Sequence, residues 1–217
     1  MKDFDDSELL REYGVLPITC LKNENELKTF EEAILATPIK CFEITMRHPF
    51  SYSAIRYFKE KHPEYVVGAG TVVNFDILNT VAEVGADYCV SPGLDESIVI
   101  HSSKIGIPFI PGCATPSEIL RAQKLNLKTV KLFPVECFGE PQILNLYESA
   151  FPSIRFLLTG ALNTETFIRY LPCANVLACG GDFLVPRDLL EKRDAKGIAN
   201  TINSCIQSAK EIRERII

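Results

Sequence analysis

The feature that most constrains the fold is an eightfold alternation of short apolar segments with longer amphipathic ones. Repeated strand–helix units imply parallel strands joined by right-handed crossovers, and eight such units close into a barrel. We therefore predict a compact (β/α)8 TIM barrel with an N-terminal helix, formed by one domain over residues 1–217. The apolar segments, rich in β-branched and aromatic residues, span residues 14–21, 39–47, 65–73, 86–93, 107–113, 129–136, 154–160 and 175–181.

The segments between the strands have apolar residues at helical spacing. Ser51 is the N-cap candidate of one of them, and Thr115 followed by Glu118 makes a capping pattern in another. An open doubly wound sheet is the alternative architecture, but it would place a GxGxxG motif after the first strand, where none is present. We predict helices over residues 23–36, 51–62, 115–125, 163–171 and 201–216.

Composition and charge exclude several classes of partner. The net charge is -5 and the pI is about 5.3. No Lys/Arg tract with interleaved aromatics is present, so we expect no nucleic-acid partner. No apolar run approaches the ~20 residues that span a membrane, and the acidic N-terminus lacks the apolar core of a signal peptide. We therefore expect a cytoplasmic protein with no membrane partner.

Cysteine and histidine spacing gives no sign of a metal site. The eight cysteines show no CxxC spacing and mostly lie inside apolar runs, so we interpret them as small buried hydrophobes in a reducing compartment. The three histidines, His48, His62 and His101, have neither ligand spacing nor a partner cluster. A zinc site is therefore not expected.

One lysine, Lys131, interrupts the apolar run "TVKLFPVE" at residues 129–136. Strand side chains alternate between the two faces of a sheet. Val130 and Leu132 should therefore face the helices, while Lys131 and Phe133 face the barrel interior. A buried ammonium is costly unless it is paired or its pKa shifts, so this lysine needs a structural or chemical reason.

A second strand carries an acid on its inner face. In "CFEITMR", residues 41–47, Phe42 and Ile44 suit packing against helices, whereas Glu43 and Arg47 belong to the inner set. Glu43 then lies at a depth similar to that of Lys131, on another strand of the same barrel. The bland alternative is a buried structural Lys–Glu pair with Arg47 on the surface.

This set of side chains suits Schiff-base chemistry on a keto acid. Lysine attacks a carbonyl only as the neutral amine, and a reference pKa of ~10.4 leaves roughly one lysine in a few thousand neutral at pH 7. Burial lowers that pKa. A buried glutamate with a raised pKa can move the protons that the reaction requires, and an arginine at the rim can hold a carboxylate through two hydrogen bonds.

Glycine-containing turns follow several strands. "VGAGTV", residues 67–72, would permit a ligand to approach the backbone closely. "LLTGALN" (157–163) and "ACGGDFLVP" (178–186) follow the seventh and eighth strands, where many barrels bind phosphate on loop amides and a helix N-terminus.

In the order "FEITMR", "VGAGTV", "SPG", "IPGCATPSE", "VKLFPVE" and "TGALN", the chain resembles the 2-keto-3-deoxy-6-phosphogluconate / 4-hydroxy-2-oxoglutarate aldolase family from about Gly14 to Leu190. The resemblance implies a class I, metal-independent pyruvate aldolase that needs no cofactor and forms a homotrimer. It implies that the enzyme cleaves a 2-keto-3-deoxy-4-hydroxy acid reversibly to pyruvate and an aldehyde.

The resemblance also implies roles for individual residues. Lys131 would be the Schiff-base lysine and Glu43 the general acid–base. Further residues would bind the substrate: Arg47 and Thr71 at the pyruvate carboxylate, Pro92 and Phe133 along the pocket wall, and Thr159, Gly160, Ala161, Gly181 and Asp182 at the distal end.

Asp182 departs from the family pattern. The family's loops after strands 7 and 8 usually carry a double glycine and a Gly-Gly-Ser, where this chain has Gly160-Ala161 and Gly180-Gly181-Asp182. A carboxylate would repel a phosphate dianion, and an N-cap aspartate could itself satisfy the amides that bind phosphate. An aldolase acting on an unphosphorylated sugar acid is therefore an alternative, unless Asp182 points away from the phosphate.

Three other functions remain as alternatives at this point. They are a non-catalytic barrel that binds a keto acid, a phosphate-binding barrel enzyme of different chemistry, and a metal-dependent aldolase. The combination of Lys131, Glu43 and Arg47 argues against the first, because a binding module has little use for a desolvated amine.

Overall fold

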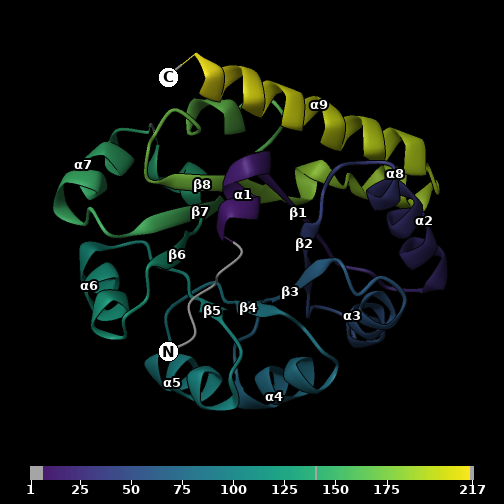
Figure 1. Cartoon of the computed structure of the whole chain (residues 1–217), viewed down its shortest axis with the longest axis horizontal. Helices are drawn as coiled ribbons and strands as arrows, with labels where there is room; N and C mark the ends of the chain where they lie inside the picture. The colour runs from purple at the N-terminus through teal and green to yellow at the C-terminus, as the bar shows by residue number, and fades with distance from the viewer. Residues whose placement is uncertain (1–6, 140, 216–217) are drawn as a thin grey trace.

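Each of the eight predicted apolar segments contains a strand of one parallel sheet. The structure, a computed structural model, describes residues 7–139 and 141–215. The strands are ordered β5-β4-β3-β2-β1-β8-β7-β6, and helices surround them (Figure 1). Their bounds are β1 Val15–Thr19, β2 Cys41–Thr45, β3 Val66–Gly70, β4 Tyr88–Val90, β5 Phe109–Ile110, β6 Thr129–Leu132, β7 Arg155–Thr159 and β8 Val176–Gly181.

The two ends of this order, β5 and β6, meet at one bridge between Gly112 and Lys131. The Lys131 amide donates to Pro111 O at 2.9 Å, and the Lys131 carbonyl accepts from Cys113 N at 2.8 Å. These two bonds turn the sheet into a nearly closed barrel, so the predicted (β/α)8 fold is confirmed.

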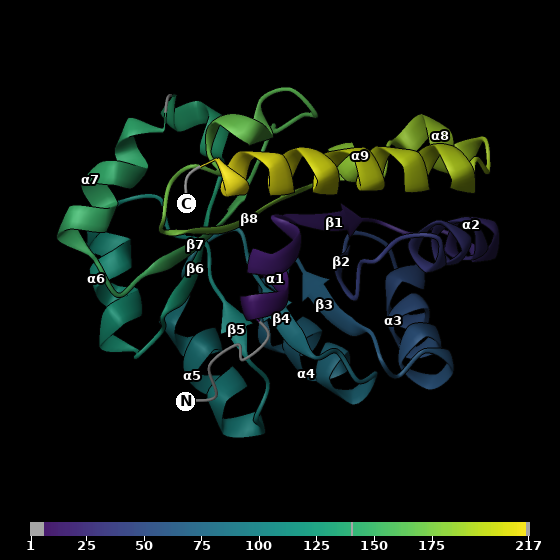
Figure 2. The same ribbon diagram turned by 45° about the horizontal axis from the view of Figure 1, so that its top comes forward.

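Helices connect most successive strands and cover the outside of the barrel, whereas the 3-10 turn η2 lies between β7 and β8. Figure 2 shows the long helix α9 passing over α8 toward α2, and both contacts are present in the structure. The helices are α1 Ser7–Tyr13, α2 Glu24–Leu35, α3 Phe50–Lys61, α4 Phe75–Glu83, α5 Glu96–Ile105, α6 Pro116–Lys124, α7 Gln142–Ala150, α8 Arg187–Glu191 and α9 Ala195–Glu214, with 3-10 turns η1 Val135–Phe138, η2 Phe167–Arg169 and η3 Asp182–Leu184.

The helix predictions are mostly confirmed, with three corrections. The predicted N-cap role of Ser51 is wrong: α3 begins at Phe50, and the Ser51 hydroxyl lies 3.5 Å from Leu21 O instead. The segment 163–171 holds only the short turn η2, since Asn163 binds the amides of Glu165 and Thr166. Such side-chain bonds to the backbone compete with helix formation.

The third correction concerns α9, which begins at Ala195 rather than at residue 201. Asp194 caps it by accepting from the Gly197 amide at 2.9 Å, and Asp is a favoured N-cap residue. Residue 216, the last of the predicted 201–216 helix, lies outside the described residues. The Thr115–Glu118 capping box is confirmed at the start of α6.

Two apolar layers fill the molecule, one inside the barrel and one between the strands and the helices. Phe42, Ile44, Val130 and Leu132 belong to the outer layer, as predicted from the strand alternation. Leu10 of α1 belongs to the inner layer, so the N-terminal helix contributes to the packing inside the barrel. The inner layer consists of Leu10, Leu16, Ile18, Cys41, Tyr88, Val90, Ile110, Leu157, Leu177 and Ala178.

Candidate active site

Polar side chains lie above the inner apolar layer, toward the carboxyl ends of the strands. On β2, Glu43 follows Cys41 by two residues and so stands one level higher on the same face. Tyr88 of β4 lies below it, donating its hydroxyl proton to Phe42 O at 3.3 Å. In barrels of this kind the carboxyl end of the strands is where active sites occur.

Glu43 is almost completely buried, with 1% of its surface exposed. Neither carboxylate oxygen has a hydrogen-bond partner among the described residues. Burial raises the pKa of Glu43, although the positive charges of Lys131 and Arg47 oppose the shift. A carboxyl group in this state can donate and accept protons closer to neutral pH than an exposed glutamate.

Lys131 is also buried, with 8% of its surface exposed. Burial lowers the pKa of its ammonium, the negative charge of Glu43 opposes this, and Arg47 lowers it further. The Nζ atom lies 5.1 Å from the centre of the Phe133 ring. Lys131 and Glu43 affect each other's pKa through their charges, as expected of two side chains in one barrel interior, and the lysine is chemically closer to a neutral amine than one in water.

The backbone of neighbouring segments is shaped around these two side chains. A Cβ atom at Gly70 would overlap Glu43 Oε1, so any other residue at this position of β3 would displace the carboxylate. A Cβ atom at Gly112 would likewise overlap Pro92 O. Because Gly112 is bridged to Lys131, this close approach places the Pro92 turn next to the lysine strand.

Arg47 lies at the exposed rim, beyond Glu43. Its Nε donates to Thr71 Oγ1 at 3.3 Å. Thr71 has φ 62°, a left-handed conformation that a β-branched residue seldom adopts. Such backbone strain costs about 1–3 kcal/mol and is concentrated at functional sites. The neighbouring amide of Val72 is held by Val90 O at 3.0 Å, which helps to fix this conformation.

The loops after β7 and β8 lie side by side next to the lysine strand. Thr159 pairs with Gly180 across the two strands, and Lys131 pairs with Leu157. Thr159 Oγ1 is buried and has no partner among the described residues. Gly160 has φ 105°, and a Cβ there would lie 2.7 Å from Pro134 Cα.

Ala161, Gly181 and Asp182 complete this distal end. Ala161 is exposed and adopts φ 60°, while Gly181 is extended with φ 173°. Asp182 is exposed and opens η3, but it does not cap that turn with its side chain. Among the described residues, the Asp182 carboxylate therefore does not accept a capping hydrogen bond from the amides of η3.

Two glycines in residues 67–72 make room for other side chains, since a Cβ atom at Gly68 would meet the Tyr88 ring and one at Gly70 would meet Glu43. The expected close approach of a ligand to this backbone stays a prediction. Sequence reasoning missed these roles and those of Gly112 and Tyr88; the glycine spacing in "GAG" was the available signal. Within the described ranges, no group of three His, Cys, Asp or Glu residues could hold a metal ion.

Comparison with known proteins identifies relatives over most of the chain. Residues 7–201 match the family model described as KDPG and KHG aldolase. A KHG/KDPG aldolase of Escherichia coli K12 is 34% identical over 196 residues, covering 90% of this chain and 92% of that protein. A 2-dehydro-3-deoxy-phosphogluconate aldolase of Pseudomonas aeruginosa PAO1 is 31% identical, covering 86% of this chain and 84% of its own.

A solved structure shares the fold closely. The KDPG aldolase of Legionella pneumophila, with pyruvate captured at low pH as a covalent carbinolamine intermediate, superimposes with a TM-score of 0.88 at 27% identity. The match covers 93% of this chain and 98% of that one.

Proposed function

The chain belongs to the KDPG and KHG aldolase family, and from that premise we propose that Lys131 forms the imine and Glu43 moves the protons. The enzyme is a class I aldolase that cleaves a 2-keto-3-deoxy-4-hydroxy acid to pyruvate and an aldehyde. The observation that carries the assignment of Lys131 is its burial near Glu43, whose carboxyl oxygens accept no hydrogen bond from the described residues, with a lowered pKa for the ammonium.

The first half of the reaction builds the imine. The neutral Lys131 amine attacks the C2 carbonyl of the keto acid, giving a carbinolamine, and Glu43 in its acid form donates the proton with which the hydroxyl leaves as water. Arg47, positioned through its contact with Thr71, holds the substrate carboxylate. Phe133, whose ring centre lies 5.1 Å from Lys131 Nζ, and Pro92 would line the pocket.

The second half breaks the C3–C4 bond. The Glu43 carboxylate removes the proton of the C4 hydroxyl, the aldehyde forms, and the bonding electrons move to the protonated imine to give an enamine. Glu43 returns a proton to C3, and water hydrolyses the resulting pyruvate imine to free the lysine. The raised pKa of Glu43 suits this exchange of acid and base roles near neutral pH.

Borohydride trapping tests the assignment. The enzyme is incubated with pyruvate and borohydride, and the adduct is located by intact-protein and peptide mass spectrometry. We expect a pyruvate-derived adduct on Lys131 that is missing in Lys131→Ala. An adduct on another lysine, or none in a correctly folded enzyme, would refute the role of Lys131.

Asp182 favours a second candidate within the same activity, an aldolase for unphosphorylated sugar acids. Its carboxylate is exposed and does not cap the turn that it opens. A phosphate bound to this turn would therefore face an uncompensated negative charge. Ala161 matters less, because its backbone amide can still donate.

Substrate profiling separates the two candidates. Cleavage of 2-keto-3-deoxy-6-phosphogluconate is compared with cleavage of its unphosphorylated form, in the native enzyme and in Asp182→Ser. If Asp182 excludes phosphate, the native enzyme has the higher kcat/KM for the unphosphorylated acid, and Asp182→Ser gains activity on the phosphorylated one. If the ratio of kcat/KM for the phosphorylated and unphosphorylated acids is the same in the native enzyme and in Asp182→Ser, this candidate is refuted.

We also propose a homotrimer in the cytoplasm. Three exposed apolar residues lie on neighbouring elements, Val73 at 49%, Phe75 at 44% and Ile100 at 45% exposure, and such residues can form a subunit contact. All eight cysteines are free, as in reducing compartments. Among the described residues, no helix has the length and apolar character needed to span a membrane. Light scattering on the purified protein tests the trimer, which a monomeric mass would contradict.

A further inference from the structure

The ladder between β1 and β8 ends below the rim of the barrel. Its last pair joins Pro17 and Gly181. Beyond this pair β1 continues alongside β2, with Ile18 opposite Glu43. The segment after β8 instead enters η3. The regular pairing therefore ends immediately beside Asp182, at the distal end of the proposed site, while η3 still packs against β1.

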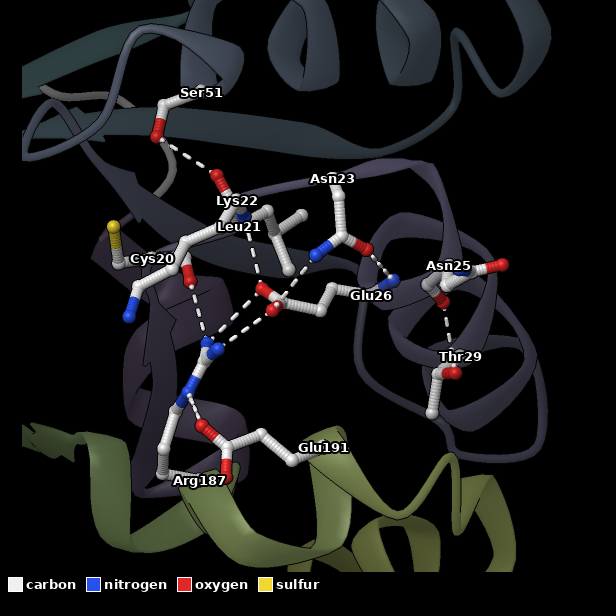
Figure 3. A network of polar contacts seen from close by, with 10 residues as sticks. All are labelled: Cys20, Leu21, Lys22, Asn23, Asn25, Glu26, Thr29, Ser51, Arg187 and Glu191. Atoms are coloured by element: carbon white, nitrogen blue, oxygen red, sulfur yellow. Dashed lines mark hydrogen bonds and ion pairs between the residues drawn. The ribbon is translucent and has the colours of Figure 1, made fainter.

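Beyond this point Arg187, the first residue of α8, reaches the segment that follows β1 (Figure 3). Its Nη1 donates to Cys20 O at 3.4 Å and to Glu26 Oε2 at 3.0 Å. Its Nη2 donates to Glu26 Oε1 at 2.6 Å. The guanidinium thus makes a bidentate pair with Glu26, the geometry in which arginine–carboxylate contacts are strongest and most directional.

Glu26 is itself fixed by its surroundings. It is 6% exposed and also accepts from the Lys22 amide at 2.9 Å and from Asn23 Nδ2 at 3.1 Å. Burial alone would raise the pKa of Glu26, but the hydrogen bonds from Arg187 and Lys22 outweigh it and lower the pKa. The carboxylate is therefore held ionised, and it links the segment after β1 to α8.

The third nitrogen of Arg187 also donates a hydrogen bond. Nε donates to Glu191 Oε1 at 2.8 Å, so two carboxylates and a carbonyl surround one guanidinium. A cation committed in this way fastens two loops together and has little capacity left for a substrate anion. The segment that it holds continues to Leu21, whose carbonyl lies 3.5 Å from the Ser51 hydroxyl (Figure 3).

We propose that the Glu26–Arg187 pair is a positioning element for the distal half of the substrate. It sets the distance between the segment after β1 and the Gly181–Asp182 turn, which forms one wall of the distal site. This inference rests on the proposed function. Loss of the pair widens or disorders that wall but leaves Lys131 and Glu43, on β6 and β2, in place.

The test uses the condensation direction, in which pyruvate and the aldehyde are separate reactants. Retro-aldol cleavage of 2-keto-3-deoxy-6-phosphogluconate gives pyruvate and glyceraldehyde 3-phosphate, so the aldehyde and its unphosphorylated form are the probes. In Arg187→Ala we expect kcat/KM for whichever aldehyde the native enzyme uses to fall about 10- to 100-fold, the range for misplacement near 1 Å. The KM for pyruvate and the rate of borohydride trapping on Lys131 should be unchanged.

Two further variants sharpen the result. Glu26→Gln removes the charge with nearly the same shape, and it should weaken aldehyde use in the same direction if Arg187→Ala fails to fold. Arg187→Lys should restore only part of the loss, because an ammonium cannot make the bidentate contact. Lys192→Ala is the matched control, since it removes an exposed ion pair to Asp188 of α8. It should change neither kcat/KM for the aldehyde nor the KM for pyruvate.

Three results would overturn the inference. The first is native aldehyde kinetics in folded Arg187→Ala or Glu26→Gln. The second is an equal loss of pyruvate trapping and aldehyde use, which would mean general damage to the barrel. The third is the absence of any pyruvate adduct on Lys131 in the native enzyme, which would refute the proposed function and remove the premise of this inference with it.

Discussion

Replacing Gly70 with alanine tests whether the position of Glu43 controls catalysis. A Cβ atom at Gly70 would overlap Glu43 Oε1 and lie 2.7 Å from Cδ, whereas ordinary van der Waals contact begins at 3.4 Å. The carboxylate must therefore withdraw by about 1 Å. The backbone of Gly70 does not require glycine for its own conformation, since Gly70 is absent from the positive-φ residues.

The expected loss is large in rate and small in stability. A misplacement of about 1 Å in a catalytic group costs up to roughly 100-fold in rate, equivalent to about 2.7 kcal/mol of activation free energy. Alanine in a strand interior is favoured over glycine by roughly 0.5–1 kcal/mol, which partly offsets the strain of moving Glu43. We therefore expect a folded protein with much lower kcat.

The assay follows pyruvate release from a saturating 2-keto-3-deoxy acid, with the melting temperature measured in parallel. Gly93→Ala is the matched control, because a Cβ there meets nothing within 4 Å and should leave kcat unchanged. Native kcat in Gly70→Ala, with the Glu43 carboxylate shown by crystallography to be displaced, would refute the argument that its position matters.

Three further predictions concern the same barrel. The variant Arg47→Leu should raise the pKa of Lys131, because the charge of Arg47 lowers that pKa. The pH dependence of borohydride trapping should therefore shift to higher pH. The KM for pyruvate should rise about 10- to 100-fold, because a charged hydrogen bond to the carboxylate is lost. The double variant Lys131→Met/Glu43→Leu should be inactive yet about 1–4 kcal/mol more stable in urea unfolding at pH 7, whereas Lys131→Met alone leaves an unpaired buried acid and should be less stable than the double variant. Thr115→Ala should cost about 0.5–2 kcal/mol of unfolding free energy in the same assay, through loss of the α6 cap, with kcat unaffected.

The sequence pattern predicts the strands well because each strand has two distinct environments. One face of β2 and β6 packs on helices, and the other faces the interior, so their alternation is visible without any tertiary information. Lys131 stands out for the same reason, as a charge at an interior position of an apolar run. The proposed role of Glu43 follows once both strands are placed in one barrel.

Features that depend on closure of the barrel were not predictable in the same way. Arg187 and Glu26 are 161 residues apart in sequence, and each reads alone as an ordinary surface charge on a helix. The use of Gly70 is equally hidden, because it depends on which neighbouring side chain occupies the space. The short turn at 167–169 escaped prediction because local bonds from Asn163 replace helical ones.

Because it forms the bridge between β5 and β6, Lys131 has both a structural and a proposed chemical role. Its main chain joins β6 to β5 through hydrogen bonds with Pro111 and Cys113, while its side chain carries the nitrogen that we propose to form the imine. Any opening of the barrel at these β5–β6 hydrogen bonds also displaces the Lys131 amine. The position of the amine and the closure of the barrel are therefore coupled. A pyruvate adduct packed against the neighbouring side chains would stabilise the junction of β5 and β6. Slower hydrogen exchange at the Lys131 and Cys113 amides would report this stabilisation.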